Sequence, residues 1–255
     1  MRVIVLSSGS KGNTTYIESE DTKILIDIGN SCKYVTDKLK TIGIDGNEID
    51  AIFITHTHTD HIKGLKVFNK KFHPQVYITK EMVADLDFLE DYNLIDKQQL
   101  IINDLIIEVI KTSHDAPGSV GYIVNNNNKS IVYITDTGYI NQKYFNKLTN
   151  KDIYIMESNH DVEMLSNCSY PFKTRQRILG DKGHLSNYDS SRYLSKFIGS
   201  KTKYIMLAHL SEENNTSSLA YETLKSRLDE NNQNVEKIII AKQNEETELI
   251  EVWSK

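Results

Sequence analysis

Four possible metal ligands lie within six residues of this chain. The apolar run 51–54, which we expect to form a buried strand, is followed closely by His56, His58, Asp60 and His61. His56 and His58 are two positions apart, and on an extended chain such side chains point to the same side. Imidazole and carboxylate groups together suit Zn²⁺, Mn²⁺ or Fe²⁺. A solvated loop that contains histidines by chance is the alternative, but four ligands in so short a stretch favour a metal site.

The pattern His56-x-His58-x-Asp60-His61 resembles the signature of the metallo-β-lactamase superfamily. The other motifs of that superfamily can be sought in order, and each is found at the end of an apolar run. These motifs contribute Asp27, His114, Asp136 and His209. One His or Asp at a strand end is more often structural, but the complete and ordered set is specific.

The resemblance implies a hydrolytic site with two divalent ions, Zn²⁺ or Mn²⁺, about 3.5–4 Å apart. The implied ligands are His56, His58 and His114 for one ion, and Asp60, His61 and His209 for the other, with Asp136 as the bridge. Asp27 would lie behind the ligands and orient them. A hydroxide that bridges the ions would be the nucleophile, because bound metal lowers the pKa of water to about 7. Asp60 is therefore also expected to be catalytic.

Alternating strands and helices must position these residues. We expect strands at 3–6, 14–17, 24–26, 51–54, 105–110, 120–124, 131–134, 153–156, 204–207, 238–241 and 249–252, with a hairpin turn at 125–128. We expect helices at 31–39, with Ser31 as the N-cap, and at 142–148, 186–197 and 219–231. Periodicity alone indicates an α/β fold with mixed sheets. The resemblance implies an αββα sandwich, in which two mixed β-sheets pack together with helices on both outer faces.

Further segments are similar to the YycJ (WalJ) family within this superfamily, and the similarity extends over essentially the whole chain. They are VLSSGSKGN (5–13), ESNHD (157–161), GDKGHLSN (180–187) and LAHLSEENN (207–215). Members of that family are regarded as 5′→3′ exonucleases on double-stranded DNA. The resemblance therefore implies a binuclear, metal-dependent phosphodiesterase with DNA as its substrate.

Phosphodiester hydrolysis also needs an acid that helps the alkoxide to leave. The segment 183–186 resembles the Gly-His-Ser segment of the tRNase Z branch, whose histidine contacts the scissile phosphate and pairs with a glutamate. By that resemblance His184 is the candidate acid and Glu157 its partner. A structural residue at a helix entry is the alternative for His184. His160 could lie near the metals or behind their ligands, or it could only orient Asp161 or bind the product phosphate.

Two other segments are candidates for substrate binding. One is a basic run that consists of Lys173, Arg175, Arg177 and Lys182. This run could follow a DNA backbone, or it could be a solvated helix face. The other is a polar loop near the N-terminus, in which the candidates are Ser10, Lys11 and Asn13. The loop could offer N–H groups to a phosphate, but its Gly and Lys spacing is not that of a Walker motif.

The composition sets the remaining limits. The net charge of −5 argues against a broadly basic nucleic-acid surface, although bound ions would add local positive charge. Only 3 prolines occur and no linker stands out, which predicts one domain over residues 1–255. The first apolar run is too short for a signal peptide and no run is long enough for a membrane span, so we expect a cytoplasmic protein.

Other activities on the same fold share the metal ligands and stay open. They include RNA processing and the hydrolysis of small phosphodiesters, thioesters, lactones or β-lactams, although the segments around Glu157 and His184 favour phosphodiesters. A mononuclear-iron oxygenase fits less well, because Asp60, His61 and His209 complete a second ligand set. A non-catalytic regulator would have no physical need for seven ligands.

Overall fold

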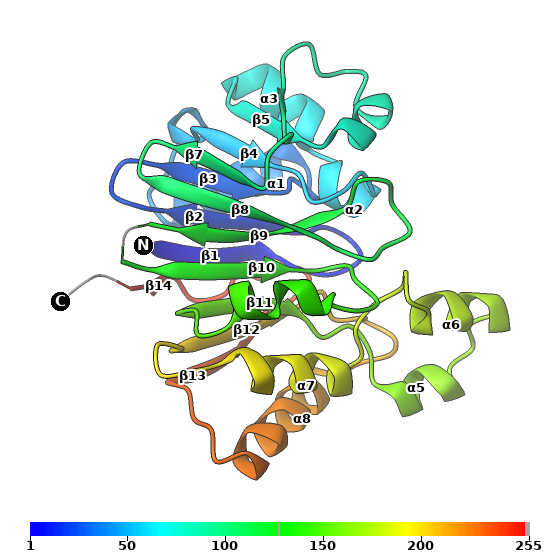
Figure 1. The fold of residues 1–255 in the computed structure, drawn as a ribbon. Coiled ribbons are helices and arrows are strands. Elements are labelled where there is room, and N and C mark those ends of the chain that lie inside the picture. The colour runs from blue at the N-terminus through cyan, green and yellow to red at the C-terminus, as the bar shows by residue number, and fades with distance from the viewer. Residues whose placement is uncertain (127, 253–255) are drawn as a thin grey trace.

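Two β-sheets pack face to face in this protein, and helices lie outside them (Figure 1). The computed structural model describes residues 1–126 and 128–252, and the strands within these residues form two sheets of seven. One sheet has the order β14 (Ile250–Glu251), β1 (Arg2–Ser7), β2 (Thr14–Glu18), β3 (Lys23–Ile26), β4 (Ala51–Phe53), β5 (Gln75–Ile78) and β6 (Asn93–Leu94). The other has the order β13 (Lys237–Ile240), β12 (Tyr204–Ala208), β11 (Ile153–Glu157), β10 (Ser130–Ile134), β9 (Val120–Asn125), β8 (Leu105–Lys111) and β7 (Gln99–Ile102).

Helices cover the outer faces of both sheets, as the αββα prediction requires. The α-helices are α1 (Cys32–Thr41), α2 (Thr59–Ile62), α3 (Leu65–Phe72), α4 (Phe145–Leu148), α5 (Val162–Asn167), α6 (Phe172–Leu179), α7 (Asn187–Phe197) and α8 (Ser217–Glu230). The 3₁₀ helices are Gly46–Glu48, Lys80–Asp85 and Gln142–Tyr144. Helix α1 packs on β1 and α3, whereas α8 packs on β13 and α7. Helices α5 and α6 project from one end of the sandwich (Figure 1).

The central strands β10 and β11 of the second sheet are apolar because both of their faces are buried. In β11, Ile153 and Ile155 belong to the core between the sheets. The alternate residues Tyr154 and Met156 belong to a separate core beneath α4, α7 and α8. Successive residues of a strand point to opposite faces, so the two cores receive alternate side chains. Because neither face meets solvent, apolar residues occupy both sets of positions.

The elements expected from the sequence are present, with shifts of one or a few residues at their ends. Ser31 caps α1, and its side chain accepts a hydrogen bond from the Tyr34 N–H. Strands β9 and β10 pair antiparallel, as the predicted hairpin requires, although Asn127 of its turn lies outside the described residues. Helix α3 and strands β5–β7 were not predicted. No helix in the described ranges is long and apolar enough to cross a membrane.

Strand direction brings the ends of distant segments to one edge of the sandwich. Strands β3 and β4 are parallel in the first sheet, and β10, β11 and β12 are parallel in the second. Strand β8 runs the same way as β10, since each is antiparallel to β9. The carboxyl ends of parallel strands are where open α/β sheets place their ligands.

Candidate metal centre

The residues predicted to bind metal all follow the carboxyl ends of these strands. His56 and His58 follow β4, and His61 lies in the adjoining helix α2. His114 follows β8, Asp136 follows β10, and His209 follows β12 directly. The cluster therefore combines four chain segments, one from the first sheet and three from the second, and forms only after the two sheets have packed together.

Asp27 and two of the predicted ligands, Asp136 and His209, follow their strands closely and adopt the left-handed backbone conformation. The φ angles are 61° for Asp27, 54° for Asp136 and 55° for His209. Asp and His tolerate this region better than most residues. Each such residue still costs roughly 1–3 kcal/mol, which the contacts of the surrounding structure must offset. The sharp turn directs each side chain back toward the end of the sandwich. We interpret this strain as part of how the site is assembled.

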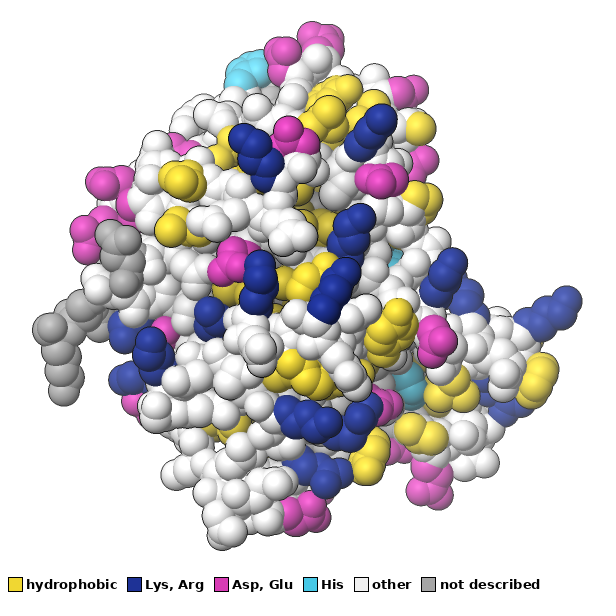
Figure 2. Space-filling model, in the orientation of Figure 1, with side chains coloured by type: hydrophobic (Ala, Val, Ile, Leu, Met, Phe, Trp, Pro, Cys, Tyr) yellow, Lys and Arg dark blue, Asp and Glu magenta, His cyan; other side chains and the backbone are white. Residues whose placement is uncertain are grey.

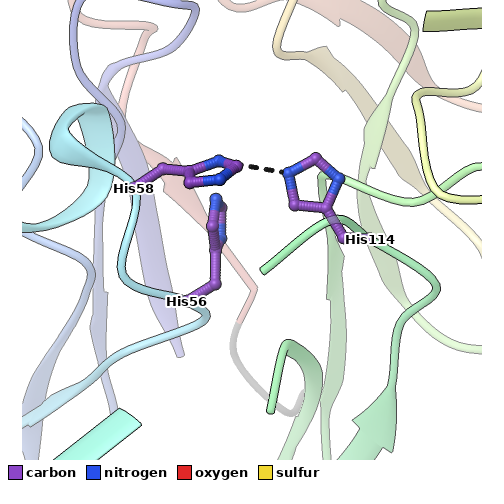
Figure 3. A group of neighbouring side chains, drawn as sticks. All are labelled: His56, His58 and His114. Atoms are coloured by element: carbon purple, nitrogen blue, oxygen red, sulfur yellow. Dashed lines mark hydrogen bonds between the residues drawn. The ribbon is translucent and has the colours of Figure 1, made fainter. Parts of the chain in front are cut away.

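One group of ligands consists of three imidazoles that converge on one point (Figure 3). The ring centroids of His56 and His58 are 4.7 Å apart, and each ring lies 4.9 Å from that of His114. His58 Nδ1 and His114 Nε2 approach to 3.3 Å. The donor atoms of the three histidines all lie within 4.8 Å of one another, which is close enough to surround one ion.

The second group consists of Asp60, His61 and His209, whose donor atoms also lie within 4.8 Å of one another. Asp60 Oδ2 is 3.5 Å from His61 Nε2 and 3.6 Å from His209 Nε2. Asp136 lies between the two groups: its Oδ2 is 3.3 Å from His61 Nε2, and its Oδ1 is 3.7 Å from His114 Nε2. The predicted bridging residue thus contacts members of both groups.

The fit of this site to metal can be tested from its hydrogen bonds. The buried atoms without a hydrogen-bond partner among the described residues include three in this site, which are His56 Nε2, Asp136 Oδ2 and His209 Nε2. A buried polar atom without a partner costs about 1–3 kcal/mol. All three atoms belong to the clustered ligands, and imidazole with carboxylate is a donor set that suits Zn²⁺ or Mn²⁺. The residues present therefore suit divalent metal binding.

The charges of the metal-free site favour the metal-binding forms of His56 and Asp60 but the protonated form of His209, which must lose its proton to bind an ion. Burial lowers the pKa of His56 well below its usual value, and His61 adds to this effect, so His56 is neutral. Burial would raise the pKa of Asp60, but the imidazoles of His209 and His61 outweigh it and hold that pKa low. Burial likewise opposes the charge on His209, yet Asp136 raises the pKa of His209 to about 10.

Hydrogen bonds behind the ligands fix which ring nitrogen faces the centre. His61 Nδ1 donates to Asp27 Oδ2 over 2.7 Å, and His114 Nδ1 donates to the Gly183 carbonyl over 3.3 Å. The ring nitrogen that makes no such bond is left for a metal, as is usual for histidine ligands. Asp27 also accepts hydrogen bonds from the Thr55 N–H and hydroxyl, at 2.8 and 2.7 Å. This contact with His61 is what the predicted orienting role of Asp27 requires, and the role itself stays a prediction.

Glu157 is completely buried and contacts two histidines at once. Its Oε1 lies 2.8 Å from His184 Nδ1 and 3.0 Å from His209 Nδ1. Its Oε2 accepts backbone N–H groups from Thr137 and Leu185. Burial would raise the pKa of Glu157, but the His184 imidazole outweighs it and lowers that pKa to about 2. The pair with His184 was expected from the sequence, whereas the contact with His209 was not.

The metal cluster opens into a cavity of about 490 Å³. Ser10 and Arg177 line this cavity, and Arg177 also pairs with Asp115 at 2.9 Å. Asp115 Oδ1 is in turn 3.4 Å from His58 Nε2. Lys11 is exposed and pairs with Glu212.

The other candidates for substrate binding have different surroundings. Lys173 is exposed on α6, and Arg175 donates to the Ser166 carbonyl. Asn13 is buried, and its amide lies 3.3 Å from Asp60 Oδ2 and 3.1 Å from His61 Nε2. Asn13 therefore contacts the ligands directly.

His160 is buried outside both ligand groups. Its Nδ1 is 3.4 Å from Asn159 Oδ1, and its Nε2 has no hydrogen-bond partner among the described residues. Burial lowers the pKa of His160 to about 4. The His160 carbonyl accepts the Asn187 N–H, which ties the end of β11 to the start of α7. Its predicted role near the metals stays a prediction.

Sequence reasoning missed two residues that build this site, Thr55 and Gly29. Thr55 precedes His56, and its carbonyl accepts the Val120 N–H of the second sheet. A Cβ at Gly29 would lie 1.8 Å from the Asp60 carbonyl oxygen, so only glycine allows the helix α2 segment to approach. The sequence shows that Thr55 precedes the histidines and that Gly29 lies two residues after Asp27. Their contacts with Val120 and Asp60 join distant parts of the chain, so the sequence pattern did not reveal them.

Comparisons with known proteins agree with this geometry. Residues 22–206 match the family described as beta-lactamase superfamily domain. The chain is 38% identical over 233 residues to the exodeoxyribonuclease WalJ of Streptococcus pneumoniae serotype 2, covering 88% of this chain and 87% of WalJ. It is 36% identical over 234 residues to the exodeoxyribonuclease YycJ of Bacillus anthracis, covering 89% and 88%.

Solved structures show the same fold at much lower identity. The metallo-β-lactamase fold protein YhfI from Bacillus subtilis superposes with a TM-score of 0.74 at 17% identity, covering 96% of this chain and 98% of YhfI. The short form of human tRNase Z superposes with a TM-score of 0.66 at 16% identity, covering 97% and 99%. With the fold and the ligand groups in place, the chain belongs to the β-lactamase superfamily and, within it, to the YycJ (WalJ) family of metal-dependent hydrolases with the metallo-β-lactamase fold.

Proposed function

We propose that this protein is a phosphodiesterase that degrades double-stranded DNA from the 5′ end, with two divalent ions in its active site. The observation that carries the proposal is the Glu157–His184 pair, 2.8 Å long, beside the ligand groups. A thioester expels a thiolate, which is a better leaving group than the alkoxide of a phosphodiester and needs such an acid less. The relatives named exodeoxyribonucleases support the same substrate.

The residues would divide the work as follows. Bound ions would supply an activated water and stabilise the charge on the phosphoryl oxygens. Glu157 Oε1 holds the proton on His184 Nδ1, so His184 Nε2 faces away from this bond and can give a proton to the departing 3′-oxygen. Asp136 Oδ1, 3.6 Å from His184 Nδ1, keeps this imidazole beside the metal ligands.

The substrate can be tested with end-labelled duplex DNA that carries or lacks a 5′-phosphate. We expect labelled mononucleotides or short products from the 5′ end, and slower cleavage of RNA and of a tRNA precursor. Thioester and lactone substrates serve as controls for the other hydrolases on this fold. Cleavage of a thioester or lactone without any cleavage of duplex DNA would refute the proposal. A chromosomal substrate would fit the predicted cytoplasmic location, which stays a prediction.

The proposed ligand groups also predict the metal content. Protein purified without chelator should approach two equivalents of a transition metal, because Asp136 contacts members of both groups. Chelation should lower the melting temperature, since ions that bind only the folded state stabilise it. Elemental analysis checks the first expectation. A single equivalent that does not increase on adding Zn²⁺ or Mn²⁺ would contradict it.

A further inference from the structure

A second and larger cavity lies beside the metal centre, with a volume of about 580 Å³. It lies among the 3₁₀ helix Lys80–Asp85, the segment after β6 and the connection between β8 and β9. His114 lines both cavities, so the second one continues the active-site cleft on the side of the three-histidine group. We call this cavity the lysine groove. Nothing in the proposed chemistry of the metal centre uses it.

The rim of the lysine groove carries more positive than negative charge. Its lysines are Lys80, Lys97, Lys111 and Lys182, and all four are exposed. None of the four forms an ion pair with a described residue. The acidic residues on the rim are Glu81 and Asp96. Four lysines against two carboxylates give the rim a charge of +2 in a protein whose net charge is −5, and this local positive charge favours an anionic ligand.

The floor of the groove is apolar. Val109, Val120 and Ala116 line it together with Leu94, whose side chain is partly exposed. Figure 2 shows Lys and Arg side chains grouped around exposed hydrophobic atoms in the middle of this face. Basic rims around an apolar floor suit a nucleic-acid strand, whose phosphates contact the lysines while a sugar or base packs below. A small free anion would gain nothing from the apolar floor.

We propose that the lysine groove binds the backbone of the substrate DNA next to the phosphate at the metal centre. This inference rests on the proposed nuclease function. It differs from the sequence-based expectation, which placed the DNA on the basic run of α6. Only Lys182 of that run lines the groove, and the other three lysines come from segments far apart in the sequence.

The test is a triple variant, Lys80→Gln, Lys97→Gln and Lys111→Gln, in the metal-loaded protein. Binding is measured by fluorescence anisotropy with a duplex whose 5′-terminal linkages are phosphorothioates that resist cleavage. Each lost contact to duplex DNA reduces the slope of log K against log salt by about 0.9, so three contacts reduce it by about 2.7. If the two proteins bind equally at 1 M salt, the variant binds roughly 500-fold more weakly than the wild type at 0.1 M salt. Turnover of bis-p-nitrophenyl phosphate should not change, because this substrate does not reach the groove.

A matched control removes the same charge elsewhere through Lys40→Gln, Lys70→Gln and Lys201→Gln. These lysines are exposed and line neither cavity. The control should bind DNA as the wild type does. Equal binding and equal salt slopes in the two triple variants would overturn the inference, even if wild-type protein cuts DNA. If wild-type protein neither binds nor cuts duplex DNA, the proposed function fails instead.

Discussion

Asp60→Ala should reduce turnover of duplex DNA by about 10³-fold or more and should lower the metal content from two equivalents to one. Asp60 is the carboxylate of the second ligand group, at 3.5 Å from His61 Nε2 and 3.6 Å from His209 Nε2. An ion that polarises a phosphoryl oxygen contributes several kcal/mol to transition-state stabilisation. At 1.36 kcal/mol for each factor of ten, about 4 kcal/mol corresponds to 10³.

The fold should survive this substitution, because Asp60 lies in the first turn of the short helix α2, outside the hydrophobic core, and its side chain is about one-fifth exposed. Circular dichroism and the melting temperature of the metal-free protein check this point. Asp37→Ala, at an exposed position on α1, is the matched control and should keep both ions and full turnover. Asp60→Ala with turnover close to that of the wild type would rule out the two-ion mechanism.

His184→Ala should keep both ions and lose roughly 10²–10⁴-fold of its turnover on duplex DNA, the range that a general acid contributes. The loss on bis-p-nitrophenyl phosphate should be smaller, because p-nitrophenolate leaves without a proton. Added imidazole should restore part of the DNA cleavage if the side chain transfers a proton. Equal losses on both substrates would mean that His184 only positions the phosphate. A loss of metal would mean that the proposed ligand set is wrong.

Glu157→Gln tests the partner of His184. Its effect is not confined to His184, because Glu157 also contacts His209. Glu157 Oε1 accepts from both His184 and His209, and Oε2 accepts two backbone N–H groups. The amide nitrogen of glutamine cannot accept, so the two donors that face it lose their partner at a cost of about 1–3 kcal/mol each. We expect a smaller loss of turnover than in His184→Ala together with a lower melting temperature. Metal analysis separates the effect through His209 from the effect through His184.

The sequence by itself determined the ligand types and the elements that carry them. His56, His58 and His61 lie so close together in the chain that their clustering needs no tertiary information. The buried strands β4, β10, β11 and β12 were also recognisable, because runs that are apolar on both faces are typical of parallel strands in a covered sheet. Helix α1 was recognisable from its Ser31 cap. The short edge strands β6 and β7 carry exposed residues and lack this signal.

Only the tertiary structure decided which of these residues meet. His114 and His58 are 56 positions apart in the chain, yet their ring nitrogens lie 3.3 Å apart, because β4 and β8 belong to different sheets that pack together. The contact of Glu157 with His209 depends on the parallel register of β11 and β12, in which Glu157 lies beside Ala208. The lysine groove arises in the same way, since Lys80, Lys97 and Lys111 come from separate elements. Such contacts have no local period or spacing, so the sequence pattern could not reveal them.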